Sequence, residues 1–146
     1  MRKGFKPLKN KYNNKRQEFA GLKFDSGIEL RRYQFLLGLQ EAGLIEELAV
    51  HPRFPLTLPN GVPVLIKGAV KKTHSRYVPD FTYYLCAREG CEAKEGLFVV
   101  EDVKSVPTAR EGYFKLKRAL FEALYGVEVT LVFWKKGEWV LNKMAP

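Results

Sequence analysis

Side chains able to do chemistry occur in two short apolar segments of this 146-residue sequence. Asp80 lies in the first segment, and Asp102 and Lys104 lie in the second. Side chains alternate between the two faces of a β-strand, so a strand through the second segment places Asp102 and Lys104 on one face and Glu101 on the other. The D-x-K spacing therefore directs a carboxylate and an ammonium group toward one place.

A hairpin that brings Asp80 beside Asp102 places their carboxylates within about 4–6 Å, where like charges repel unless a proton or a cation intervenes. Hard oxygen ligands favour Mg²⁺, with Mn²⁺ as the alternative. A carboxylate-bound metal can activate water and stabilise the extra negative charge that develops on a phosphodiester. We expect the Lys104 ammonium to orient the water or to stabilise the transition state.

Glu29 is a further acidic candidate, on a helix expected over residues 26–42. Ser26 and Glu29 fit a capping box, which by itself would explain the glutamate. If the helix packs across the sheet, however, Glu29 is directed at the metal or its water. Glu101 is expected to point away from Asp102, into solvent or toward a basic residue.

Basic residues predict a polyanionic partner. The sequence has 25 Lys and Arg against 16 Asp and Glu, a net charge of +9 and a pI near 9.6. Such a charge favours nucleic acid over other partners when the cations are clustered. Lysine and arginine residues are clustered before the first acidic residue, Glu18. They recur in the predicted basic loop and on one face of the second predicted helix, which includes Arg118. The predicted nucleic-acid contacts are Arg2, Lys3, Lys6, Lys9, Lys11, Lys15, Arg16, Lys71, Lys72, Arg76, Lys115 and Lys117.

The elements that must position these groups alternate in type along the chain. A strand, a crossover helix and a strand over 96–134 require a parallel pair, so the sequence predicts an α/β fold with a mixed sheet flanked by helices. The expected elements are an edge-type strand interrupted by prolines at 44–58, a returning strand at 62–66, a basic loop at 68–75, strands at 76–86 and 96–104, a helix at 110–125, and strands at 127–134 and 138–141.

Other classes of protein are excluded by composition. The two cysteines, Cys86 and Cys91, are too few for a disulfide scaffold and are expected as plain thiols. No apolar run approaches a membrane span, and no signal-peptide core follows the basic start. The sequence therefore predicts no membrane association and a cytoplasmic location. A flexible basic arm is expected at 1–16, followed by one domain at 17–146.

Pro79-Asp80, Asp102-Val103-Lys104 and an upstream helical Glu29 stand in the order found in the PD-(D/E)xK nuclease superfamily, which this sequence resembles. It looks most like small phage-encoded endonucleases and shares its core pattern with archaeal-type Holliday junction resolvases. The resemblance implies a restriction-endonuclease-like core and action inside the cell, including a phage host's cytoplasm. It also implies a Mg²⁺ site formed by Glu29, Asp80, Asp102 and the Val103 carbonyl.

The expected activity is structure-selective cleavage of DNA, as in a Holliday junction resolvase, because phosphate-directed binding is well supplied and no base-reading module is evident. Cutting two opposed strands requires a homodimer. Phe133, Trp134 and Trp139 would suit a dimer surface, although core packing is the preferred explanation. The alternatives are a different phage nuclease, acting in replication or packaging, and a non-catalytic basic nucleic-acid-binding module.

Overall fold

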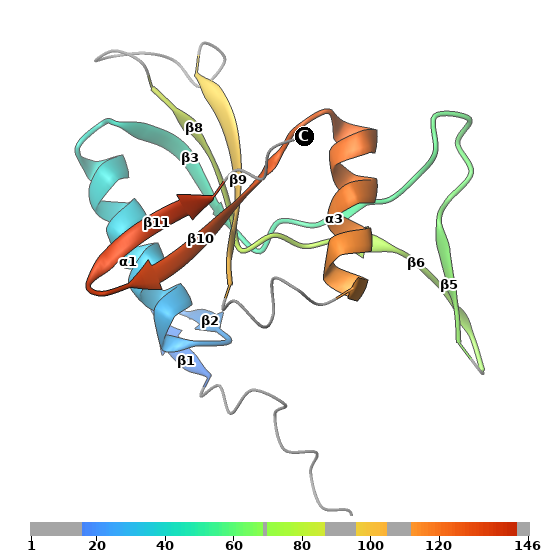
Figure 1. The fold of residues 1–146 in the computed structure, drawn as a ribbon, viewed down its shortest axis with the longest axis horizontal. Helices are drawn as coiled ribbons and strands as arrows, with labels where there is room; N and C mark the ends of the chain where they lie inside the picture. Colours follow the sequence, from blue (N-terminus) through green and yellow to red (C-terminus); the bar gives the residue numbers. More distant parts are fainter. Residues whose placement is uncertain (1–15, 69, 87–95, 105–111, 143–146) are drawn as a thin grey trace, which may run out of the picture.

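The computed structural model describes residues 16–68, 70–86, 96–104 and 112–142. Its centre is a five-stranded mixed sheet with the order β11-β10-β9-β8-β3, and helices lie against both sides (Figure 1). This confirms the predicted α/β fold. The strands are β3 (Ile45–Val50), β8 (Phe81–Leu85), β9 (Leu97–Val103), β10 (Val129–Lys135) and β11 (Glu138–Asn142).

The pairing of β9 with β10 is parallel, as predicted, and places Val129 opposite Val100. Helix α3 (Gly112–Tyr125) lies between these two strands in the sequence and supplies the crossover. The remaining pairs of the sheet are antiparallel. The crossover leaves β9 in the middle of the sheet, with β8 on one side and β10 on the other. The strand that carries the D-x-K residues is therefore a central strand.

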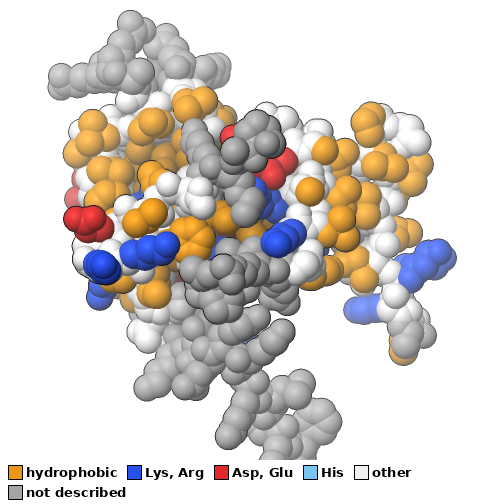
Figure 2. Space-filling model, viewed as in Figure 1, with side chains coloured by type: hydrophobic (Ala, Val, Ile, Leu, Met, Phe, Trp, Pro, Cys, Tyr) orange, Lys and Arg blue, Asp and Glu red, His pale blue; other side chains and the backbone are white. Residues whose placement is uncertain are grey.

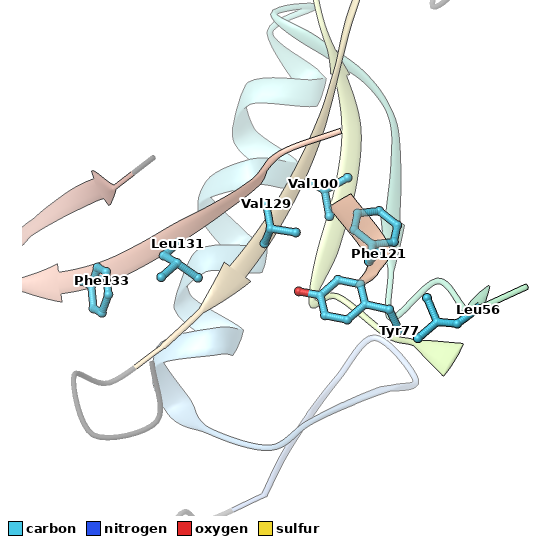
Figure 3. Close-up of a cluster of buried hydrophobic side chains, with 7 residues drawn as sticks. All are labelled: Leu56, Tyr77, Val100, Phe121, Val129, Leu131 and Phe133. Carbon is cyan, nitrogen blue, oxygen red and sulfur yellow. The ribbon is translucent and has the colours of Figure 1, made fainter. Parts of the chain in front are cut away.

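The two helices cover opposite faces of the sheet. Val100 of β9 packs with Phe121 of α3, whereas Val99 and Val103 pack in the cluster that includes Leu36 of α1 (Gly27–Glu41). Alternate residues of a strand face opposite sides, so these contacts assign one helix to each face. Figure 3 shows the buried cluster on the α3 side, which consists of Leu56, Tyr77, Val100, Phe121, Val129, Leu131 and Phe133.

Three two-stranded ribbons complete the fold. They are β1 (Gln17–Phe19) with β2 (Leu22–Phe24), β4 (Phe54–Pro55) with β7 (Arg76–Tyr77), and β5 (Leu65–Lys67) with β6 (Lys72–His74). Three predictions need correction. The strand predicted at 76–86 is divided into β7 and β8. The predicted strand at 44–58 is divided, because His51 has a φ of 50° and Pro52 lacks an N–H, so that β3 ends at Val50. The predicted basic loop at 68–75 contains β6.

Among the C-terminal aromatic residues, core packing is confirmed for Phe133, whereas Trp134 and Trp139 are half-buried outside the two core clusters. Phe133 is buried in the core, and the Trp134 and Trp139 rings meet edge to face at 4.7 Å. Cys86 is disulfide-bonded, which corrects the prediction of a plain thiol, and Cys91 lies outside the described residues. None of the described helices is long and apolar enough to cross a membrane.

Candidate metal centre

The candidate site lies at one end of the central sheet, where β3 and β9 end and β8 begins. The register pairs Phe81 with Glu101 and Phe81 with Val50, so the residues just beyond these pairs are brought together. They are His51 after β3, Asp80 before β8, and Asp102 and Lys104 at the end of β9. Sequence-distant residues thus meet where three neighbouring strands share an end.

Asp80 and Asp102 are held against each other by the backbone. The Asp80 N–H donates to Asp102 Oδ1 at 3.3 Å, and the Val103 N–H donates to Asp80 Oδ2 at 2.8 Å. The Tyr77 hydroxyl donates to Asp102 Oδ2. The hairpin of β8 and β9 therefore brings the two carboxylates together as predicted. Asp102 is 2% exposed, and the Asp80 side chain is 15% exposed.

Burial of these carboxylates opposes their ionisation. It raises the pKa of Asp80 well above its ordinary value, and the charges of Asp102 and Glu29 raise it further, while Lys104 and the Val103 amide lower it. Burial also raises the pKa of Asp102, against the opposing effects of Lys104 and the Tyr77 hydrogen bond. The same surroundings raise the pKa of the Tyr77 hydroxyl, so it remains a hydrogen-bond donor at neutral pH. Two desolvated carboxylates in contact are a charge conflict that a cation relieves.

Lys104 faces the same side of β9 as Asp102, as the D-x-K spacing predicts. Its Nζ lies 3.8 Å from Asp102 Oδ1 and 4.5 Å from the centre of the Phe114 ring of α3. A cation over an aromatic face is attracted by the ring's negative charge distribution. The ammonium is therefore held between the carboxylate and the aromatic ring while its side chain remains partly exposed to solvent.

Glu29 reaches this site from the first turn of α1. Ser26 caps the helix by accepting from the Glu29 N–H at 3.2 Å, which is the serine half of the predicted capping box. The Glu29 carboxylate, however, lies in the site, with Oε1 2.5 Å from His51 Nε2. Capping therefore explains the backbone of Glu29, and its buried side chain has a second role.

His51 is the residue of the site that sequence reasoning missed. Its Nε2 lies 3.8 Å from Asp80 Oδ1, and its own N–H donates to the Asp80 carbonyl at 3.0 Å. The hydrogen bond to the Glu29 carboxylate is the largest influence on His51 and raises the pKa of its imidazole, against the effect of burial. The left-handed φ of 50° is uncommon for a residue other than glycine and is found at functional sites. The available signal was Pro52, which lacks an N–H and therefore favours a strand end beside His51, within the strand predicted at 44–58.

The donor set fits a divalent cation. One ligand atom each from Glu29, His51 and Asp80 lie within 4.8 Å of one another. Two carboxylates and an imidazole suit a borderline ion such as Mn²⁺, and Mg²⁺ would rely on the oxygens and water. Asp102 borders this group but does not belong to it, and Val103 contributes an N–H to Asp80. The predicted ligand roles of Asp102 and of the Val103 carbonyl stay predictions.

Glu101 points away from the site, as alternation predicts, but it does not reach solvent. It is 1% exposed and accepts two hydrogen bonds from Arg32 of α1, at 2.6 and 2.9 Å, and one from the Tyr83 hydroxyl. The alternative of a basic partner is therefore confirmed, and the alternative of solvent is wrong. Glu101 belongs to a neutralised, buried ion pair on the α1 face.

The predicted nucleic-acid contacts are dispersed over the surface. Lys71, Lys72 and Arg76 are exposed on or beside the β5–β6 ribbon, and Lys115 and Lys117 lie on α3. The sequence predicts a solvated position for Arg118 on the same helix face. It is instead buried, and its Nε lies 3.1 Å from Glu122 Oε1. Arg16 is exposed near Asp25. The contacts predicted at Arg2, Lys3, Lys6, Lys9, Lys11 and Lys15 lie outside the described residues.

Comparison with known proteins adds a family assignment. A family model described as "Protein of unknown function (DUF1064)" matches residues 9–138, which include every residue of the candidate site. The chain belongs to the DUF1064 family. No curated protein and no solved structure matches the chain. Membership of DUF1064 therefore groups this chain with relatives over nearly its whole length, but the family description names no function.

Proposed function

We propose that this DUF1064 protein is a metal-dependent endonuclease that hydrolyses phosphodiester bonds in DNA. One observation carries the proposal: two largely buried carboxylates, those of Asp80 and Asp102, lie beside each other next to a cluster of metal donors, and an ammonium group lies on the same strand face as Asp102. A structural ion pair would not need a second buried carboxylate. The non-catalytic alternative leaves that arrangement without a reason, since uncompensated buried charge costs stability.

Each side chain has a role that follows from its position. Glu29, His51 and Asp80 would hold the cation, and Asp102 would complete or orient that set. Bound there, a divalent cation would activate water and stabilise charge on the phosphate. Lys104 Nζ, in reach of Asp102, is placed to donate to a phosphate oxygen as charge develops. Tyr77 holds the Asp102 carboxylate in position from the α3 side.

The proposed substrate follows from charge and exposure. A net charge of +9 on 146 residues attracts a polyanion, and the exposed lysines of the β5–β6 ribbon and the exposed Lys115 of α3 can contact phosphates without reading bases. Branched DNA, such as a four-way junction, is the proposed preferred substrate. A homodimer would supply the two sites that a symmetric double cut requires.

Cleavage of supercoiled plasmid tests the activity. The wild-type protein should nick the plasmid with Mg²⁺ or Mn²⁺ and should be inactive with EDTA. Asp102→Asn and Lys104→Ala should each slow cleavage by about 10²–10³-fold, because each removes a charge that acts on the reacting phosphate. The matched controls are Glu138→Gln, which removes an exposed acid on β11, and Lys135→Ala, which removes an exposed cation on β10. Full activity in both site variants would refute the proposal.

Substrate preference needs a separate comparison. A four-way junction and a linear duplex built from the same strands should be supplied at equal phosphate concentration, with Mn²⁺ present. We expect faster cleavage of the junction, by paired cuts, and a dimer by light scattering. Equal rates on the two substrates, or a monomeric protein on the junction, would contradict junction selectivity and would indicate a nuclease that cuts one strand at a time.

A further inference from the structure

A long part of the chain around the site lacks acidic residues altogether. Between Glu47 and Asp80 the sequence has no Asp or Glu, but it has Arg53, Lys67, Lys71, Lys72 and Arg76. All sixteen acidic residues lie in the rest of the chain, so this segment is more basic than the sequence as a whole. The segment includes β4 to β7, and therefore the ribbon of β5 and β6.

The β5–β6 ribbon projects from the body of the protein. Figure 1 shows it extending beyond α3, on the side away from α1, and the ribbon pairs with no other strand among the described residues. All six residues of its two strands are exposed. In the space-filling view the outer part of the ribbon carries basic side chains (Figure 2), and the basic residues of its two strands are lysines. A two-stranded ribbon is marginally stable alone, so its packing at the base matters.

The base of the ribbon is fixed to the core. The Ser75 N–H donates to the Val64 carbonyl at 2.7 Å, and the Leu56 N–H donates to the Ser75 carbonyl at 2.9 Å. Ser75 and Leu56 are buried. Two residues after Ser75, the Tyr77 hydroxyl donates to Asp102 in the candidate site. The ribbon is therefore an arm with a fixed base, and that base is continuous with the site.

We propose that the β5–β6 ribbon is a DNA-binding arm that holds the phosphate backbone of a duplex beside the bond that is cut. This inference rests on the proposed function for its ligand, DNA. Lys67, Lys71 and Lys72 supply the charges, and the absence of acids in the segment means that nothing on the ribbon repels phosphate. The arm binds the backbone without reading base sequence.

A second copy of the chain is the competing occupant, because Leu65 and Ile66 of the ribbon are exposed. In a symmetric contact between two ribbons, however, the lysines of one would face the lysines of the other. Like charges brought together across an interface are unfavourable, and the ribbon has no acid to offset them. Charge complementarity therefore favours DNA.

Binding as a function of salt tests the arm. Lys71→Gln/Lys72→Gln should be compared with Lys135→Gln/Lys136→Gln, because both are adjacent exposed lysine pairs and both changes remove two charges. Duplex DNA binding is measured by fluorescence anisotropy without metal, from 50 to 300 mM KCl. Two lost phosphate contacts should lower the slope of log K against log salt by about two and weaken binding about tenfold or more at 0.1 M salt. Lys71→Arg/Lys72→Arg should bind as the wild type does.

The outcomes separate this inference from the proposed function. The arm is supported if the ribbon variant loses affinity and slope while the matched control keeps both, with unchanged circular dichroism. If the two variants are equal and the wild type still nicks plasmid, the inference is overturned and the nuclease proposal stands. If the wild type never cleaves DNA, the nuclease proposal is lost, whatever the ribbon does. A change in oligomeric state of the ribbon variant, without a change in DNA affinity, would identify the second copy as its occupant.

Discussion

Glu101 and Asp102 are adjacent on β9 and both are buried, but they differ in whether a nearby cation neutralises the carboxylate. Glu101, on the α1 face, accepts two hydrogen bonds from Arg32 and one from Tyr83. Asp102, on the opposite face, contacts a second acid, Asp80, and its nearest cation is 3.8 Å away. The Glu101 carboxylate is neutralised within the fold, whereas on the other face Asp102 shares its surroundings with a second acid and no cation among the described residues forms a close ion pair with it. Burial alone therefore does not suggest a functional carboxylate, whereas burial without neutralisation makes Asp102 a candidate.

The largest effect expected from this comparison is on stability at Glu101. Glu101→Gln keeps the shape of the side chain but leaves the Arg32 guanidinium buried without a counter-charge. Breaking one partner of a buried pair costs about 3–5 kcal/mol of unfolding free energy. Urea denaturation measures the loss.

Replacing both partners provides the control for that measurement. Arg32→Met/Glu101→Leu should recover most of the stability, because the pair is then replaced by apolar groups of similar size. A loss under about 1 kcal/mol in Glu101→Gln would mean that the ion pair does not neutralise that face as described.

A smaller effect of opposite sign is expected at Asp80. Its raised pKa means that the folded state favours the protonated carboxyl, so without metal the contribution of Asp80 to stability is most favourable at low pH. Stability should fall as pH rises from the ordinary value of 3.8 through the folded pKa. Asp80→Asn removes this decline and should raise the unfolding free energy in EDTA by about 1–2 kcal/mol, with a larger gain at pH 8 than at pH 5.

The sign of this effect distinguishes the two faces of β9. A loss of stability in Asp80→Asn, at every pH and without metal, would show that Asp80 is as well satisfied as Glu101. Thermal melts at the two pH values are sufficient to decide, provided that EDTA is present throughout.

Local pattern was enough to predict one half of the site. Strand alternation placed Asp102 and Lys104 on one face, and the parallel pairing of β9 with β10 followed from the crossover helix. These features depend on neighbours in sequence or on chain connectivity. The sequence also predicted the start of α1, because Ser26 is a strong cap.

The other half depends on contacts between distant residues. Arg32 and Glu101 are 69 positions apart, and no local pattern identifies a buried partner at that separation. His51 joins the site because its left-handed backbone ends β3 and directs the side chain toward Glu29. The returning strand predicted at 62–66 overlaps β5, but β6 was missed because its lysines and the nearby glycine are typical of a polar loop and the strand is only three residues long.

Calorimetric titration with Mn²⁺ tests most directly whether the negative face of β9 is a metal site. The wild-type protein should bind the ion, Asp80→Asn should bind it about tenfold more weakly or worse, and Glu138→Gln should match the wild type. A charged ligand contributes to affinity in a way that an exposed acid far from the site does not. A wild-type protein that does not bind Mn²⁺, or an Asp80→Asn variant that binds it with unchanged affinity, would contradict a metal site on this face of β9.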